Sequence, residues 1–227
     1  GASLGRVLAG CPFTPADGRA VRLALDRALS AALVGEVPVG AVILRDGQLI
    51  ATGYNRPITT HDPTAHAEMV ALRHAAELLE NYRLPDCELF VTLEPCAMCA
   101  MALMHARFKR VVFGAWDLKT GSAGSVVDLF AQPQLNHHTT VQGGLLAEPC
   151  GDLLREFFAR RRAEQKAQRQ REREALAGLQ APAAELPAIP AGEALELDAA
   201  QLAGLSDLND LNDLSDLSDL NQPGFKR

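Results

Sequence analysis

The chain has 227 residues, of which 48% are hydrophobic, enough to bury one sizeable core. Its net charge of −6 is unevenly spread: residues 178–227 contain nine acids and two bases, whereas the rest of the chain carries one net positive charge. The overall acidity therefore does not exclude nucleic acid as a partner of the main body. No apolar run reaches the ~18 residues of a membrane span, and the N-terminus lacks a signal-peptide core. We expect a soluble cytoplasmic protein without a membrane partner.

Five cysteines are present, an odd number, and only Cys96 and Cys99 are close together in the sequence. A secreted disulfide framework favours an even number of cysteines in a shorter chain. The cysteine pattern therefore indicates a reducing compartment, with these two cysteines as candidate metal ligands and the other three as free thiols.

The first half of the chain shows one helix, a hairpin and a second helix. Apolar positions at helical spacing predict a helix over residues 15–33, and two apolar runs joined at Asp46-Gly47 predict a hairpin over residues 37–55. Residues 56–64 contain two prolines and are predicted to be loop. A helix is expected from Thr64, as its cap, to about Glu80.

The second half alternates strands and helices. The expected elements are a strand at 87–93, a helix over 94–107 with Pro95 in its first turn, a strand at 109–115, a glycine-rich loop at 116–125, a strand near 138–144 and a long helix from about Glu148 to Leu176. This alternation predicts an α/β domain with helices packed on a largely buried sheet.

The composition divides the chain into three parts. We predict a flexible N-terminal extension at residues 1–14, one folded domain at 15–174 and an acidic low-complexity tail at 175–227. The tail ends with a leucine at every third position, a period that fits neither a helix nor a strand. Two interpretations remain open: a disordered tail, or a leucine-bearing segment that folds on a partner of unknown identity.

The motif "PCAMC" brings the sulfurs of Cys96 and Cys99 to one side of the first turn of a helix. Two thiolates are an incomplete zinc site, and His66, at the start of the preceding helix, is the natural third ligand. Three protein ligands and a water are typical of a catalytic zinc, which lowers the pKa of that water to about 7. Glu68 lies in the right place to move its proton without binding the metal.

"HAE" followed by "PCAMC" matches the H-x-E…P-C-x-x-C signature of zinc-dependent nucleoside and nucleobase deaminases. The segments "EVPVGAV", "NRPITTHDPTAHAE", "NYRL", "VTLEPCAMC", "RVVFGAWDLKTGSAGS" and "LREFFARRR" extend the similarity over about residues 15–170. Together they resemble the bacterial tRNA-specific adenosine deaminases.

This resemblance implies a three-layer α/β/α cytidine-deaminase-like fold, in which helices flank a central mixed sheet of about five strands. It implies a homodimer that binds one Zn²⁺ per subunit through His66, Cys96 and Cys99. The implied reaction is the hydrolytic conversion of adenosine to inosine at the wobble position of a tRNA anticodon, with Glu68 as the proton shuttle. The tRNA anticodon stem-loop would be bound by Asn55, Val37, Val39, Pro57, Asp117, Lys119, Phe157, Phe158, Arg161 and Arg162.

Two other functions remain open: a deaminase of free nucleobases or nucleosides, and a non-catalytic zinc-containing RNA-binding subunit. The retained Glu68 disfavours the second. Phe157 and Phe158 could either pack in the core or stack on bases, since adjacent positions point different ways. Beyond Ala163 the bases and acids alternate, and we expect a solvated helix there. We expect Glu94 to cap a helix and Met98, Met101 and Met104 to pack in the core or at a dimer contact.

Overall fold

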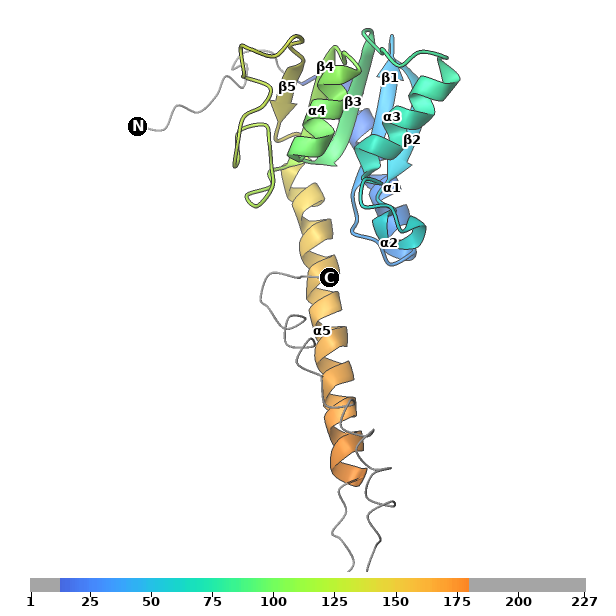
Figure 1. Cartoon of the computed structure of the whole chain (residues 1–227), viewed down its shortest axis with the longest axis vertical. Helices are drawn as coiled ribbons and strands as arrows, with labels where there is room; N and C mark the ends of the chain where they lie inside the picture. The colour runs from blue at the N-terminus through green and yellow to red at the C-terminus, as the bar shows by residue number, and fades with distance from the viewer. Residues whose placement is uncertain (1–12, 180–227) are drawn as a thin grey trace, which may run out of the picture. The chain divides into compact units, whose positions relative to one another are not determined.

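A computed structural model of the chain describes residues 13–179. The elements in these residues are α1 (Pro15–Leu33), β1 (Gly40–Arg45), β2 (Gln48–Tyr54), α2 (Pro57–Thr60), α3 (Ala67–Leu78), β3 (Cys87–Leu93), α4 (Ala97–His105), β4 (Arg110–Ala115), β5 (Thr140–Gly143) and α5 (Ala147–Leu179) (Figure 1). The predictions for residues 1–12 and 180–227 fall outside the described part. Thr14, assigned to the extension, is the N-cap of α1, and α5 continues past the domain boundary predicted at residue 174.

The five strands form one mixed sheet in the order β2-β1-β3-β4-β5. β1 pairs antiparallel with β2 and β3, whereas β3, β4 and β5 run parallel to one another. The hairpin between β1 and β2 turns at Asp46 (φ 51°) and Gly47 (φ 76°), the left-handed conformations that a two-residue turn of this kind requires. The predicted hairpin and mixed sheet are confirmed.

Side chains of the central strands alternate between the two faces of the sheet, and each face is covered by helices. Val42, Phe90 and Val112 pack with Val21 and Ala24 of α1. Their neighbours Ile43, Leu89 and Val111 pack on the opposite face with Ala71 of α3 and Leu103 of α4. Figure 1 shows α3 and α4 in front of the sheet. The three-layer α/β/α fold is therefore confirmed.

Two helices begin later than the sequence pattern indicated. α3 has His66, not Thr64, as its N-cap; the Thr64 hydroxyl instead donates to Asp62 in the preceding turn. α4 has Cys96 as its N-cap, so Pro95 precedes the helix instead of lying in its first turn. The loop predicted at residues 56–64 contains the short helix α2, which begins at Pro57, where the fixed φ of proline suits a first helical position.

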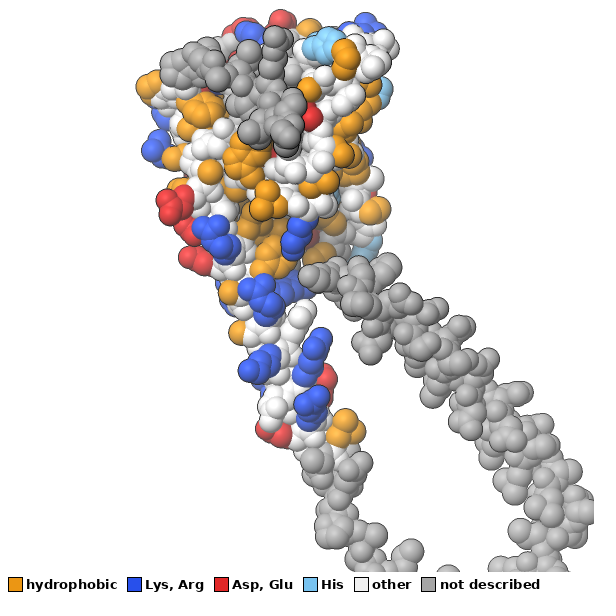
Figure 2. All heavy atoms as spheres, turned by 90° about the vertical axis from the view of Figure 1, so that its left-hand side faces the viewer, with side chains coloured by type: hydrophobic (Ala, Val, Ile, Leu, Met, Phe, Trp, Pro, Cys, Tyr) orange, Lys and Arg blue, Asp and Glu red, His pale blue; other side chains and the backbone are white. Residues whose placement is uncertain are grey.

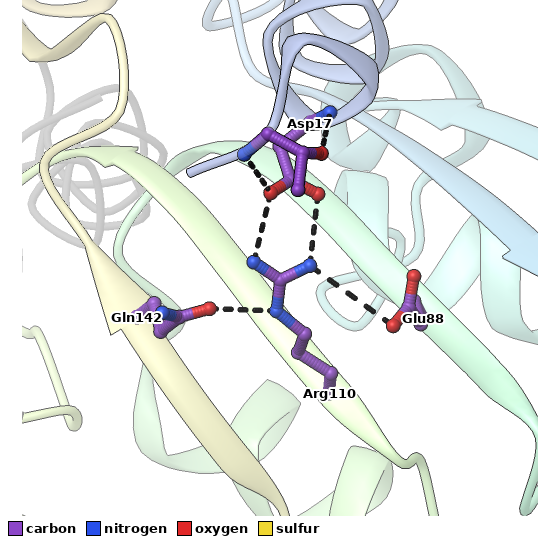
Figure 3. Close-up of polar contacts among 5 residues, drawn as sticks. Asp17, Glu88, Arg110 and Gln142 are labelled. Carbon is purple, nitrogen blue, oxygen red and sulfur yellow. Dashed lines mark hydrogen bonds and ion pairs between the residues drawn. The ribbon is translucent and has the colours of Figure 1, made fainter. Parts of the chain in front are cut away.

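An ion pair joins α1 to the middle of the sheet. The Arg110 guanidinium, at the start of β4, donates to both carboxylate oxygens of Asp17 at 2.8 and 3.0 Å. Arg110 also donates to the Gln142 side-chain oxygen at 2.6 Å, and a Glu88 carboxylate oxygen lies 4.0 Å from it (Figure 3). One side chain thus connects α1, β3, β4 and β5.

The last helix begins in the core and continues into solvent. Cys150, in its first turns, packs so closely on β4 that a Cβ added to Gly114 would lie 2.4 Å from the Cys150 sulfur. Phe157 is buried, but residues 162–176 are all exposed. None of the helices in residues 13–179 combines the length and apolar character needed to span a membrane.

Candidate active site

The three predicted zinc ligands meet where two helices begin. His66 and Cys96 have extended backbone conformations as the N-caps of α3 and α4, and neither side chain makes a capping hydrogen bond. Cys99 lies in the first turn of α4 and is fully buried. Both helices thus direct their N-terminal ends, where backbone dipoles favour thiolate and other negative charge, at one point.

The distances within this cluster fit a zinc ion. His66 Nδ1 lies 3.6 Å from the sulfur of Cys96 and 3.6 Å from the sulfur of Cys99. A tetrahedral zinc with ordinary Zn–N and Zn–S bond lengths separates nitrogen from sulfur by about 3.6 Å. His66, Cys96 and Cys99 form a candidate metal site with three protein ligands, which is the number found in catalytic zinc sites.

The two thiols differ in their readiness to ionise. The hydrogen bond from Cys99 lowers the pKa of Cys96 to about 4, so this side chain is a thiolate at neutral pH. The same hydrogen bond, together with burial, raises the pKa of Cys99. Metal binding therefore releases a proton from Cys99, and affinity falls as the pH is lowered.

Glu68 lies beside the cluster, in the second position of α3. Its side chain is only 4% exposed, and burial raises the pKa of this carboxyl to about 7. His66 precedes the helix and Glu68 is inside it, so both side chains can reach the site despite a spacing of two residues. The structure therefore places a carboxyl beside the three candidate ligands.

Asn55, at the end of β2, connects the pocket to α3. Its side-chain oxygen accepts a hydrogen bond from the Ala67 N–H at 2.9 Å, which satisfies one of the free donors at the start of the helix. The amide NH₂ group is thereby directed away from the helix, and Asn55 lines the pocket. A ligand with an acceptor atom in this position would be recognised by that group.

A cavity of about 880 Å³ opens above the cluster. It contains most of the residues predicted to bind substrate. Those that line it are Val37, Val39, Asn55, Pro57, Asp117, Lys119 and Phe158, together with His66, Glu68 and Cys96.

The remaining predicted contacts lie outside this cavity. Phe157 is 6% exposed and packs in the core, whereas Phe158 is 41% exposed and lines the cavity; stacking of Phe158 on a base stays a prediction. Arg161 donates to the Gly35 carbonyl at 3.1 Å and so ties α5 to the loop after α1. Arg162 is exposed on α5.

The loop after β4 forms one wall of the cavity. Asp117 accepts from Lys119 N–H at 2.9 Å and from the Thr120 hydroxyl at 2.6 Å, so its carboxylate organises its own loop. Trp116, edge-on to Phe113 and 42% exposed, lines the cavity but was not predicted. Its position directly after a parallel strand was the available signal, because such positions commonly line sites in α/β proteins.

Glu94 has a different role from the helix cap that we predicted. Its carboxylate is 2% exposed and accepts from the N–H groups of Asp117 (3.0 Å), Ala123 (2.8 Å) and Ser125 (3.1 Å), and from the Ser125 hydroxyl. A Cβ on Gly121 would lie 2.4 Å from this carboxylate. Glu94, which stands between β3 and Cys96, therefore fixes the loop of residues 116–125 relative to the metal ligands.

The same combination of His-Cys-Cys ligands and a neighbouring glutamate defines the zinc-dependent deaminases of nucleobases, and the chain falls in that class. Residues 15–115 match the family described as the cytidine and deoxycytidylate deaminase zinc-binding region.

Similar proteins of known name show which family within this class the chain belongs to. A tRNA-specific adenosine deaminase from Haemophilus influenzae is 49% identical over 151 residues, which are 66% of this chain and 87% of the relative. One from Bacillus subtilis is 42% identical over 146 residues, 64% of this chain and 91% of the relative. The chain belongs to the family of tRNA-specific adenosine deaminases.

Two solved structures of deaminases are similar to this chain. A structure from a study of A-to-I editing by tRNA:A34 deaminases at the wobble position of transfer RNA has a TM-score of 0.59 and 44% identity, and covers 60% of this chain and 99% of its own. A guanine deaminase from Nitrosomonas europaea has a TM-score of 0.54 and 27% identity, covering 68% of this chain and 88% of its own.

Proposed function

We propose that the protein hydrolytically deaminates adenosine to inosine at the wobble position of a tRNA anticodon. The observation that carries this proposal is the buried carboxyl of Glu68 beside a three-ligand metal cluster at the base of a large cavity. The similarity to relatives named tRNA-specific adenosine deaminase supports the choice of tRNA adenosine as the substrate.

The residues of the site divide the chemistry between them. His66, Cys96 and Cys99 would hold one zinc ion, which when bound supplies a water of lowered pKa. Glu68 would accept a proton from the attacking water and deliver it to the departing amino group, which leaves as ammonia, so the carboxyl would be ionised again when the reaction ends. Asn55 offers its NH₂ group to an acceptor of the target nucleoside, while Val37, Val39 and Pro57 exclude water.

The size and rim of the cavity favour a nucleotide within RNA over a free base. About 880 Å³ is near the upper end of small-molecule pockets. Two exposed aromatic side chains, Trp116 and Phe158, line it, and single-stranded RNA loops are commonly held by stacking splayed bases on such rings. Asp117 and Lys119 lie in the loop that would meet the neighbouring nucleotides.

The similarity to a guanine deaminase keeps a free-base enzyme as the competing function. Purified protein is incubated with anticodon stem-loops that differ only in the first anticodon base, and with free adenosine, adenine and guanine. Inosine formed in the adenosine-containing stem-loop, and far more slowly from free adenosine, is the expected result. Faster turnover of a free purine would replace the proposal with the competing function.

We also propose that the protein is a cytoplasmic homodimer. Apolar side chains occur all round α4, yet Met98 and Met101 are only partly buried within the chain, and a helix of this character is normally covered. A second subunit would cover this surface, and a reducing compartment keeps the two thiol ligands available. Light scattering of the eluted protein should give twice the monomer mass; a monomer at micromolar concentration would contradict the dimer.

A further inference from the structure

Five of the eight bases of α5 lie on one side of the helix. At 3.6 residues per turn, Arg155, Arg162, Lys166, Arg169 and Arg173 fall within an arc of about 60°. We call these five residues the α5 basic stripe. The acids Glu156, Glu164, Glu172 and Glu174 lie about 90° or more from its centre. The helix beyond Ala163 is exposed to solvent, as expected, and the alternation of charge along the sequence becomes segregation of charge on its surface.

Arg155, at the start of the stripe, pairs with Asp152, but within the described part of the chain the other four members of the stripe have none of the ion pairs that the helix forms elsewhere. Arg160, off the stripe, pairs with Glu164 at 3.8 Å, and Arg171 donates to Gln168. Between residues 13 and 179, no acidic partner contacts Arg162, Lys166, Arg169 or Arg173. All four are exposed, and Figure 2 shows Lys and Arg side chains along this part of the molecule.

This arrangement is unfavourable for an isolated helix. Like charges three and four residues apart repel each other, and Arg162, Lys166, Arg169 and Arg173 follow one another at these spacings. Placing the acids of the same helix between them would have stabilised it. A polyanion lying along the stripe would remove the repulsion, and arginine and lysine are the side chains that bind phosphate groups.

The stripe begins at the active-site cavity. Arg155 lines the cavity, and Phe158, which also lines it, is one turn further along the helix at the edge of the stripe. From Arg155 to Arg173 the helix advances about 27 Å, well beyond the cavity itself. A molecule that places one base in the cavity and continues along α5 must be a nucleic acid longer than the target nucleotide and its neighbours.

We infer that the α5 basic stripe binds the phosphate backbone of the stem of the same RNA whose target base enters the cavity. This inference rests on the proposed function. The stripe contributes affinity that does not depend on sequence, while the cavity selects the base. The tRNA:A34 deaminase structure covers 60% of this chain, less than the described residues 13–179, so part of the described chain has no counterpart in it.

The test compares two double variants of the full chain with the same change in charge. Arg169→Gln/Arg173→Gln removes two stripe bases, and Arg160→Gln/Arg171→Gln removes two bases off the stripe; glutamine keeps a similar helix propensity. Both are made together with Glu68→Gln, so that the RNA stays intact during binding. Dissociation constants for an anticodon stem-loop are measured by fluorescence anisotropy at several KCl concentrations.

Each phosphate contact contributes about 0.7–0.9 to the slope of log K against log salt. The stripe variant should reduce this slope by about 1.5 and the off-stripe variant should leave it unchanged. Shortening the stem to two base pairs should abolish the difference between the variants. Equal slopes for both variants, or a difference that persists without the stem, would overturn the inference. Inosine formation by the unmodified protein is measured in a separate assay. A failure of the proposed function can therefore be told apart from a failure of the inference about the stripe.

Discussion

Two glutamates of similar burial have unrelated tasks, and their neighbours explain the difference. Glu68 is at the start of α3 beside three metal-ligating atoms, whereas every acceptor position of Glu94 is used by backbone N–H groups and a serine hydroxyl. A carboxylate held by several fixed donors is a structural support, and one beside a metal site can exchange protons.

Replacing Glu68 with glutamine preserves its shape but removes the proton-accepting oxygen. We expect kcat to fall at least about 100-fold, because general acid–base catalysis commonly contributes that much. Bound zinc, measured by metal analysis, should stay at one ion per chain. Glu77→Gln, on the exposed side of the same helix, is the control. Unimpaired turnover in Glu68→Gln would contradict the assigned role.

Glu94→Gln should weaken RNA binding without loss of metal. The amide NH₂ of glutamine would face N–H groups that now donate to a carboxylate, so the loop of residues 116–125 loosens. We expect KM for the stem-loop to rise about tenfold, with kcat less affected. The backbone amide hydrogens of Asp117, Ala123 and Ser125 should also exchange with solvent faster in this variant.

Asp128→Asn, a change in the same region but outside the cavity, serves as the control for Glu94→Gln. If KM and amide exchange in Glu94→Gln match those of this control, Glu94 does not position the loop.

At the level of the elements, the Asp17–Arg110 ion pair connects α1 to the sheet. Burial alone would raise the pKa of Asp17, but the hydrogen bonds and charge of Arg110 outweigh it and hold this pKa below its usual value. The carboxylate therefore stabilises the fold above its unfolded-state pKa of about 3.9, and that contribution is lost as the pH falls through the folded-state pKa.

Asp17→Asn removes the carboxylate that pairs with the guanidinium of Arg110 at 2.8 Å, whereas Glu88 lies 4.0 Å from it. We expect the free energy of unfolding to fall by about 3 kcal/mol, the usual effect of removing one member of a buried pair. Urea denaturation at neutral pH measures it. Asp86→Asn breaks the exposed pair with Arg45 and should cost less than about 1 kcal/mol. Equal losses in the two variants would refute the importance of the buried pair.

Most helices and strands could be predicted from the sequence because the patterns that indicate them lie within a few neighbouring residues. The 3.6-residue pattern predicts the helix at residues 15–33, Asp46-Gly47 predicts the hairpin, and "PCAMC" with "HAE" predicts the candidate metal ligands. The start of α3 could not be predicted, because Asn55 from another element satisfies its first N–H. Neither could the task of Glu94, whose donors are 23 to 31 residues away.

The basic stripe is an exception, since its signal was present in the sequence. The spacing of Arg162, Lys166, Arg169 and Arg173 follows the helical period, but the intervening acids conceal it when the residues are read in order. The helix past Ala163 was predicted and is confirmed, so projecting these residues onto the helix would have revealed the stripe from the sequence.

For the whole molecule, charge is divided between the body and the C-terminal segment. Residues 180–227 contain nine acids and two bases, whereas residues 1–179 carry one net positive charge. Long-range repulsion of RNA by that segment should slow association at low ionic strength and vanish once salt screens it.

Ending the chain at Leu179 should therefore raise the association rate constant for an anticodon stem-loop in low salt, with the two rates converging above about 0.3 M KCl. Stopped-flow fluorescence measures both. The same rate constant for both chains in dilute salt would show that the acidic segment has no electrostatic influence on encounter.

His66 and Cys96 occupy N-cap positions, where a serine or aspartate would normally close the helix. Neither side chain makes a capping hydrogen bond, because each faces the candidate metal site. We therefore expect metal binding and formation of the first helical turns to depend on each other. Glu68 lies in the first turn of α3. Chelation should therefore fray that turn and displace the Glu68 carboxyl, and reconstitution with zinc should restore the helix ends as well as the metal site.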